Sequence, residues 1–103
     1  KKANLDLSDV LDVLHVTDFR SPIFDGVGAS VIRGDYSPSF ALRLMLKDAK
    51  LVKAFADRMQ SPVPATEATL EIITQAVGEG WGEENASALI KVLSKKAGVD
   101  LKG

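Results

Sequence analysis

Apolar residues recur every three or four positions along most of this chain, and short breaks rich in proline, glycine or serine separate the recurrences. Such spacing is typical of amphipathic helices that bury one side. No segment alternates for long enough to predict a lasting sheet, and no internal repeat is evident. The pattern therefore predicts an all-α domain with about five helices joined by short connections. The expected helices cover approximately residues 7–16, 22–33, 45–59, 64–77 and 85–97.

Residues suited to helix ends lie at these boundaries. Asp6 and Ser21 can cap helix N-termini with their side-chain oxygens, because each precedes an apolar recurrence. Pro22 and Pro64 suit the first helical position, where a missing N–H is harmless. Gly34 is suited to end the second helix. The helix boundaries thus rest on capping chemistry as well as on periodicity.

The pair Gly26-x-Gly28 lies inside the second expected helix. Closely spaced glycines also occur in nucleotide-binding loops, but no strand precedes this pair and no third glycine follows it. We therefore expect these glycines to let another helix approach closely.

The stretch from Phe40 to Lys53 combines two rhythms. Its first part alternates like an extended segment, and the positions concerned are Phe40, Leu42, Leu44 and Leu46. Its second part has helical spacing, which predicts a helix beginning near Met45. The apolar stripe expected for this helix comprises Leu46, Ala49, Val52, Phe55, Ala56 and Met59. The charged pair Lys47-Asp48 lies where the rhythm changes.

Composition narrows the function classes. Of 103 residues, 46% are hydrophobic and 26% are charged, which is typical of one small globular domain and argues against disorder. The formal net charge of −1 includes no basic patch that would favour nucleic acid. No apolar run is long enough to predict a membrane span. The absence of cysteine excludes disulfides and thiolate metal sites and fits a cytoplasmic location.

Two positions are candidates for chemistry on residue type alone. His15, the only histidine, is expected at the end of the first helix, where stabilising that end is a commoner role than catalysis or metal binding. Lys47 is expected in the first turn of its helix, where its charge would add to free backbone N–H groups in binding an anion. Asp48 can accept hydrogen bonds from a hydroxyl or amide. The alternative is that Lys47, Lys50 and Lys53 form an ordinary solvated face.

Several motifs together resemble the C-terminal helical domain of the β-hydroxyacid dehydrogenases, the family of 3-hydroxyisobutyrate dehydrogenase, tartronate semialdehyde reductase and the glyoxylate/succinic semialdehyde reductases. The motif Phe40-x-Leu42-x-Leu44-x-x-Lys47-Asp48 is the most specific of them. The supporting segments are Asn4-Leu5-Asp6, Asp35-Tyr36-Ser37-Pro38-Ser39-Phe40, Pro62-Val63-Pro64 and the run from Gly78-Glu79-Gly80-Trp81-Gly82 to Leu89. The resemblance implies a fold like the C-terminal domain of 6-phosphogluconate dehydrogenase.

This resemblance also implies a reaction and a division of roles. The reaction is hydride transfer between NAD or NADP and a small 3-hydroxy acid or semialdehyde. Lys47 is implied to lie near the cofactor, and Phe40 and Asp48 to line the substrate site. The family's catalytic lysine lies on a long helix expected upstream of Lys1. Because the chain also lacks a Rossmann fingerprint, residues 1–103 are expected to be the substrate-side and dimerisation domain of a longer enzyme, inactive alone, with the cofactor bound mainly by the missing domain.

An alternative function class uses the same helices without catalysis. In it, the chain is a helical oligomerisation or interaction module, and Lys47-Asp48 is a surface pair. Both readings predict a homo-oligomer. Helical domains of this family pack against partner subunits, and an isolated domain would expose apolar faces. Neither reading predicts nucleic acid or a membrane as a partner, nor a metal site.

Overall fold

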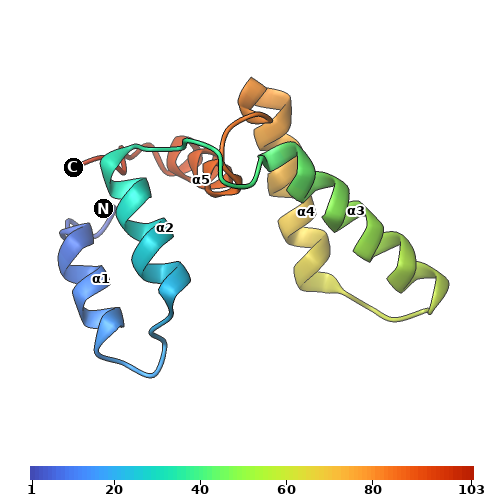
Figure 1. Ribbon diagram of the computed structural model, residues 1–103, viewed down its shortest axis with the longest axis horizontal. Helices are drawn as coiled ribbons and strands as arrows, with labels where there is room; N and C mark the ends of the chain where they lie inside the picture. The colour runs from blue at the N-terminus through green and yellow to red at the C-terminus, as the bar shows by residue number, and fades with distance from the viewer. The chain divides into compact units, whose positions relative to one another are not determined.

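The computed structural model describes all residues 1–103, and its regular elements are helices joined by loops (Figure 1). The prediction of an all-α fold with five helices is confirmed. The helices are α1 (Leu7–His15), α2 (Pro22–Arg33), α3 (Leu42–Arg58), α4 (Pro64–Ala76) and α5 (Ile90–Ala97). A π-helical turn, Val77–Trp81, follows α4, and a 3₁₀ turn, Ala86–Leu89, leads into α5. No helix combines the length and apolar character needed to cross a membrane.

The chain divides into two compact units, and each is described by itself. The first unit comprises Lys1–Tyr36 and Leu93–Gly103. The second unit comprises Ser37–Val92 and contains α3, α4, the π turn and the 3₁₀ turn. The boundary near Val92 falls inside α5.

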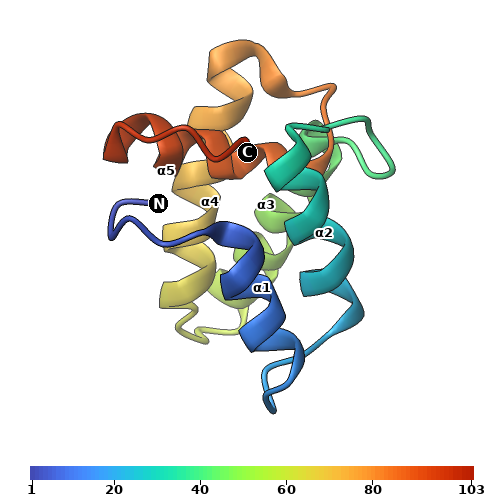
Figure 2. The same cartoon turned by 90° about the vertical axis from the view of Figure 1, so that its left-hand side faces the viewer.

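In the first unit, α1 and α2 lie side by side as an antiparallel pair (Figures 1 and 2). The predicted caps are confirmed: the Asp6 carboxylate accepts hydrogen bonds from the N–H groups of Ser8 and Asp9, and Ser21 Oγ accepts one from the N–H of Phe24. Gly34 ends α2 in the left-handed conformation, with φ of 70°. Capping chemistry thus sets both ends of α2, as its sequence indicates.

The close approach predicted for the glycine pair occurs at only one of its members. A Cβ atom added to Gly28 would lie 2.7 Å from Leu11 Cδ2 of α1. No atom lies within 4 Å of the same position at Gly26. Gly28 is therefore the residue that allows α1 and α2 to pack, whereas Gly26 faces open space.

This difference predicts opposite effects for two identical substitutions. Gly26→Ala should raise the free energy of unfolding by about 0.5–1 kcal/mol, because alanine favours helix and meets no neighbour. Gly28→Ala gains the same propensity but forces the Leu11 branch to move, which costs about 1–3 kcal/mol. We expect Gly28→Ala to be neutral or destabilising by up to about 2 kcal/mol. Urea unfolding of both variants measures the difference, and equal stabilisation would contradict the packing role of Gly28.

The second unit contains all the residues of the chain that are buried. Leu42 of α3 and Ile73 of α4 are its largest buried side chains, with 0% and 1% of their surfaces exposed. The other buried residues are Ala56, Ala76, Ala86, Ala88 and Val92. Small alanines at these positions let α3, α4 and the 3₁₀ turn approach closely, so the core of this unit is compact.

Helix α3 begins three residues earlier than expected, and the prediction of an extended segment through Leu46 is wrong. Leucines at alternate positions also satisfy part of a helical pattern, because Leu42 and Leu46 are four residues apart. Leu42 is buried, while Leu44, Met45 and Leu46 are half-buried. The alternating leucines were therefore an ambiguous signal, which burial of Leu42 on the helix resolves.

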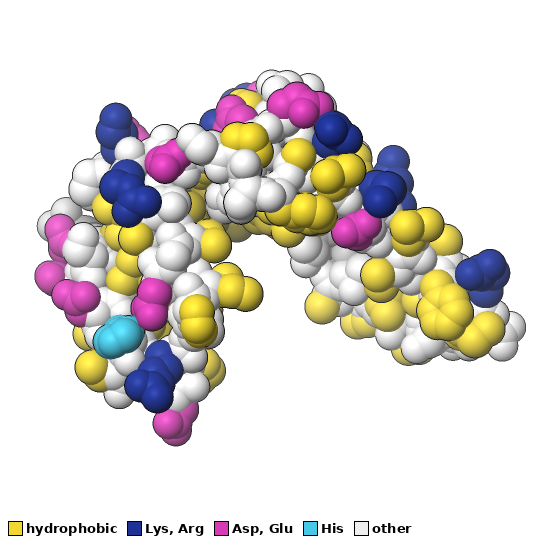
Figure 3. Space-filling model, in the orientation of Figure 1, with side chains coloured by type: hydrophobic (Ala, Val, Ile, Leu, Met, Phe, Trp, Pro, Cys, Tyr) yellow, Lys and Arg dark blue, Asp and Glu magenta, His cyan; other side chains and the backbone are white.

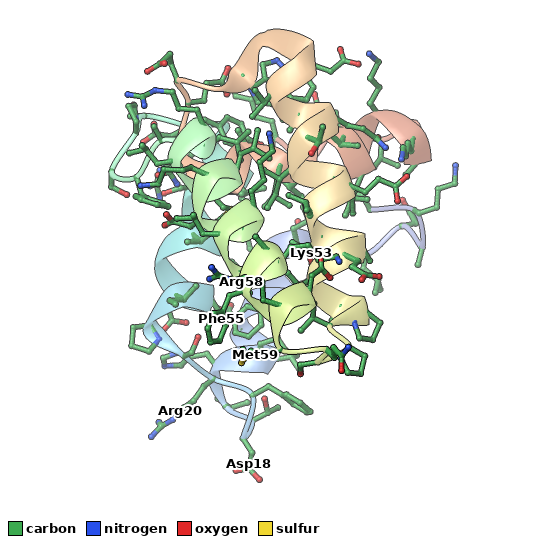
Figure 4. All side chains as sticks on the ribbon, turned by 90° about the vertical axis from the view of Figure 1, so that its right-hand side faces the viewer. Asp18, Arg20, Lys53, Phe55, Arg58 and Met59 are labelled. Atoms are coloured by element: carbon green, nitrogen blue, oxygen red, sulfur yellow. The ribbon has the colours of Figure 1, made fainter.

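The apolar stripe expected for α3 also divides into two sides. Leu46, Ala49 and Ala56 are half-buried or buried. Val52, Phe55 and Met59 are instead 51%, 57% and 60% exposed. Lys53 takes an inner position: it lies toward α4, whereas Phe55 and Arg58 lie on the other side of α3 (Figure 4). The Arg58 guanidinium lies 5.7 Å from the centroid of the Phe55 ring.

Lys53 links α3 to α4 by charge. Its ammonium group pairs with Asp57 one turn along and with Glu67 of α4, where Nζ lies 3.4 Å from Oε1. The hydrogen bond to the Asp57 carboxylate raises the pKa of Lys53 above 10.5, and the bond to Glu67 adds to this, while partial burial opposes it. The expectation that Lys53 belongs to a solvated lysine face is therefore wrong, whereas Lys47 and Lys50 are exposed.

A pKa that is higher in the folded state makes stability sensitive to alkaline pH. The contribution of Lys53 should be complete below about pH 10.5 and should be lost as the pH rises through the folded-state pKa. We expect Lys53→Met to flatten the fall of the unfolding midpoint in the pH range above about 10.5, and Lys50→Met to leave that fall unchanged. Thermal unfolding followed across this pH range measures both. An identical pH dependence for wild type and Lys53→Met would refute the role of the ion pairs.

Candidate functional site

The N-terminus of α3 is closed by a loop that lies forty residues further along the chain. The N–H of Leu42 donates to the carbonyl oxygen of Glu84 at 2.8 Å, and the N–H of Arg43 donates to that of Gly82 at 2.9 Å. The N–H groups of Leu44 and Met45 both donate to the carbonyl of Ala41. The N–H groups of the first three helical residues, which a helix start leaves without regular helical partners, are therefore satisfied.

Asn85 holds the residues that precede this helix. Its Oδ1 atom accepts hydrogen bonds from the N–H of Ser39 at 3.1 Å, from Ser39 Oγ at 3.1 Å and from the N–H of Phe40 at 3.2 Å. The carbonyl of Phe40 in turn accepts from the N–H of Ala86 at 2.8 Å. Ala41 and Asn85 form an isolated antiparallel bridge. These bonds fix the backbone of Phe40, whose side chain remains 41% exposed.

The loop that supplies these partners has its own supports. Gly80 has φ of 96°, a conformation that favours glycine, and it kinks the chain within the turn that follows α4. Lys91 pairs with the Glu84 carboxylate and lies 5.1 Å from the centroid of the Trp81 ring. Arg43 Nε contacts Glu83 Oε1 at 2.7 Å. Aromatic, ionic and glycine-dependent features therefore together hold the loop against the start of α3.

Lys47 and Asp48 lie together on the exposed surface of α3. Lys47 Nζ is 3.5 Å from Asp48 Oδ1, and the two side chains are 64% and 56% exposed. The prediction that Lys47 occupies the first helical turn is wrong, because α3 begins at Leu42 and Lys47 is in its second turn. The prediction of free N–H groups beside it is also wrong, since the loop carbonyls occupy them.

This geometry decides what kind of ligand group the segment suits. An exposed ammonium with one loose carboxylate partner can meet an anion, but the closed N-terminus of α3 offers no cradle of N–H groups for a phosphate. An exposed carboxylate can accept hydrogen bonds from a hydroxyl, and an exposed ring on a fixed backbone can shield a reacting centre from water. The residues of this segment can therefore supply only a minor part of the binding of a nicotinamide cofactor, through one contact each. No group of three or more metal-ligating side chains is present.

His15 lies away from this segment, in the first unit. Its Nδ1 atom is 3.2 Å from Asp25 Oδ1 of α2, and both side chains are about half exposed. The pair joins the end of α1 to α2, in accord with the expectation that His15 has a structural role at a helix end.

Sequence reasoning did not find Asn85 as part of the site. In the sequence, Asn85 or Glu84 is suited to cap the last helix, yet the Asn85 side chain makes no capping bond there and bonds to Ser39, Phe40 and Ser87 instead. The available signal was the combination of a glycine-rich loop with a polar residue after it. Such a signal does not reveal which distant segment the polar side chain contacts.

The fold is an all-α domain, and comparison with known families identifies the class of protein to which this domain belongs. Residues 1–93 match the family described as "NAD-binding of NADP-dependent 3-hydroxyisobutyrate dehydrogenase". The chain belongs to this family. The resemblance to the helical domain of the β-hydroxyacid dehydrogenases is thereby confirmed.

Individual relatives include enzymes and a nuclear protein. L-threonate dehydrogenase of Escherichia coli strain K12 is 32% identical over 102 residues, which are 99% of this chain and 33% of that protein. The cytokine-like nuclear factor N-PAC of Aedes aegypti is 35% identical over 88 residues, which are 85% of this chain and 16% of that protein. The crystal structure of 3-hydroxyisobutyrate dehydrogenase from Salmonella typhimurium superposes with a TM-score of 0.82 at 32% identity, over 88% of this chain and 32% of that one. The chain therefore spans one third or less of the length of these relatives.

Proposed function

We propose that this chain supplies one wall of the active site of an NAD(P)-dependent oxidoreductase, which transfers a hydride between the nicotinamide and a small 3-hydroxy acid or semialdehyde. Membership of the family supports a dehydrogenase of this class. The observation that carries the proposal is the exposed Lys47-Asp48 pair on α3, downstream of an exposed Phe40 with a fixed backbone. Residues 1–103 then act as the C-terminal, substrate-side domain of the enzyme.

Each of the three residues has a separate role in this proposal. The Lys47 ammonium contacts an anionic part of the cofactor and contributes a single charge-assisted hydrogen bond. The Asp48 carboxylate accepts a hydrogen bond from the substrate. The Phe40 ring covers the path of the hydride against water. The nicotinamide, when bound, accepts or donates the hydride, and the choice between NAD and NADP depends on residues outside these three.

The catalytic lysine and most of the cofactor site belong to a part of the enzyme upstream of Lys1. We therefore expect the 103-residue chain alone to be inactive, because it has a closed helix start in place of a phosphate cradle. A cytoplasmic location and a homo-oligomer remain predictions of the same proposal.

A direct assay tests the proposed reaction. We expect the complete gene product to reduce NAD or NADP with short 3-hydroxy acids, and the purified 103-residue chain to give no rate above a heated control. The measurement is nicotinamide absorbance across a panel of 3-hydroxy and 2-hydroxy acids with both cofactors. Turnover by the 103-residue chain would contradict the split site, and inactivity of the complete gene product on every 3-hydroxy acid would contradict the proposed class.

A second candidate function is a non-catalytic interaction module. It is favoured by exposed apolar side chains on α3, where Leu51, Val52, Phe55 and Met59 are between 51% and 61% exposed and hydrophobic atoms lie at the surface over this helix (Figure 3). The chain is also similar to a protein named as a nuclear factor, so its relatives are not all named as enzymes. In this reading, α3 packs against another subunit and Lys47 contributes only to the surface. Substitution of Lys47 separates the two functions, because only the catalytic role predicts a loss of activity with an intact oligomer.

A further inference from the structure

The side chain of Asn85 forms hydrogen bonds through both its oxygen and its nitrogen. Its Oδ1 atom accepts three hydrogen bonds from Ser39 and Phe40, and its Nδ2 atom donates to Ser87 Oγ at 2.8 Å. The two backbone N–H groups require an acceptor, so they determine which end of the amide faces them. The amide therefore has one orientation, with its oxygen toward the segment that carries Phe40.

The contacts on Phe40 restrict its backbone on both sides. Its N–H bonds to the Asn85 side chain, and its carbonyl bonds to the N–H of Ala86. All of these partners come from one short segment that lies 45 positions away along the chain. The Phe40 side chain on this backbone stays 41% exposed, so part of the ring is open to contact with a ligand. A restricted backbone lowers the entropy lost when the ring contacts a ligand.

We propose that Asn85 is the positioning residue for Phe40. It holds the ring in place at the approach to α3, so that the ring meets the substrate without rearrangement. The acceptor oxygen is the essential feature, because the three bonds to Ser39 and Phe40 all end on it. This inference rests on the proposed function for the contact between Phe40 and substrate, but the hold of Asn85 on Phe40 is testable without activity.

The first experiment measures amide exchange in the complete gene product. Asn85→Ala leaves the N–H groups of Ser39 and Phe40 without their acceptor, so hydrogen exchange in the peptide spanning residues 39–41 should accelerate about tenfold or more. Asn85→Asp retains an acceptor oxygen and should stay within about threefold of wild type. Thr69→Ala is a matched control, because it removes a side-chain-to-backbone bond of α4 elsewhere in the same unit. Where Asn85→Ala does not fold, Asn85→Gln displaces the oxygen by one methylene and carries the same test.

The second experiment asks whether Asn85 acts through Phe40. Asn85→Ala and Phe40→Ala should each lower kcat/KM about 10–100-fold, since misplacement of a contact by about 1 Å suffices for such losses. The double variant should be no worse than Phe40→Ala by more than about threefold, because both changes remove the same contact. Asn85→Asp should rescue the rate, and Thr69→Ala should leave it unchanged.

The outcomes are distinguishable. Unchanged exchange at residues 39–41 in Asn85→Ala overturns the positioning role, and so do losses of kcat/KM that multiply in the double variant. Complete gene product without hydride-transfer activity refutes the proposed function, while the exchange experiment still decides whether Asn85 holds Phe40.

Discussion

Lys47→Ala in the complete gene product is expected to lower kcat/KM about 10–100-fold while leaving the oligomeric state unchanged. That loss corresponds to a hydrogen bond to a charged group of about 1.5–3 kcal/mol. The Lys47 side chain is 64% exposed and its Nζ lies 3.5 Å from Asp48 Oδ1, so removing it should have little effect on folding. The expected loss therefore arises on binding. Initial rates and sedimentation of the variant measure both quantities.

Lys50→Ala is the matched control for this prediction. Lys50 is exposed on the same helix, one turn further along, and its replacement changes the net charge equally. We expect it to retain kcat/KM within about twofold, because a charge screened by solvent contributes little at a distance. Equal losses in both variants would indicate general electrostatic attraction. An oligomer that dissociates with Lys47→Ala, with normal activity per folded subunit, would favour the interaction module instead.

Leu42→Ala is expected to destabilise the second unit by about 2–5 kcal/mol, the range for a leucine truncated in a tight core. Leu42 is completely buried, and it is also the first residue of α3. Its N–H donates to the Glu84 carbonyl. Collapse of the structure into the cavity left by alanine should therefore also displace the loop that packs on the start of α3. We therefore expect lower stability and lower activity from this one change. Urea unfolding at constant pH measures the first effect.

Leu51→Ala tests whether the loss at Leu42 comes from burial. Leu51 lies on the same helix but is 61% exposed, so its truncation should change the free energy of unfolding by no more than about 0.5 kcal/mol. Leu42→Met conserves most of the volume and should cost less than about 1.5 kcal/mol. Similar effects of Leu42→Ala and Leu51→Ala would contradict the assignment of the core.

Local chemistry was sufficient to predict most of the helices. The caps at Asp6 and Ser21 lie within three residues of the N–H groups they accept from, so they can be read from the sequence directly. Gly34 ends α2 for an equally local reason, its left-handed backbone. Where a boundary depends on neighbouring residues alone, pattern and propensity locate it to within a residue or two.

The start of α3 shows where this reasoning fails. No side chain caps it, because the carbonyls of Gly82 and Glu84 take that role from a distant loop. The leucines before Met45 satisfy a strand and a helix pattern equally well, and only tertiary contacts decide between them. Because these contacts come from a distant loop, the sequence did not reveal the role of Asn85. For the same reason Lys47 lies one turn further into the helix than expected. Residues whose roles depend on long-range contacts cannot be assigned from spacing alone.

The family resemblance indicates a functional site at Lys47, which residue spacing alone does not indicate. On pattern alone, Lys47 was at least as well explained as a solvated lysine, and its exposure is consistent with that reading too. The co-occurrence of Phe40, Lys47 and Asp48 at the family's spacing favours a site, and the matched family supports the class of enzyme. The roles of the individual residues remain proposals, which binding measurements can separate.

The most direct test is to measure cofactor Kd and substrate KM in the complete gene product for three variants, Phe40→Ala, Lys47→Ala and Asp48→Ala. We predict that Lys47→Ala raises the Kd of the nicotinamide cofactor about tenfold or more and changes substrate KM less. Phe40→Ala and Asp48→Ala should do the reverse, raising KM or lowering kcat while cofactor Kd stays within about threefold. Three variants with wild-type Kd, KM and kcat would contradict the assignment of this segment to the active site.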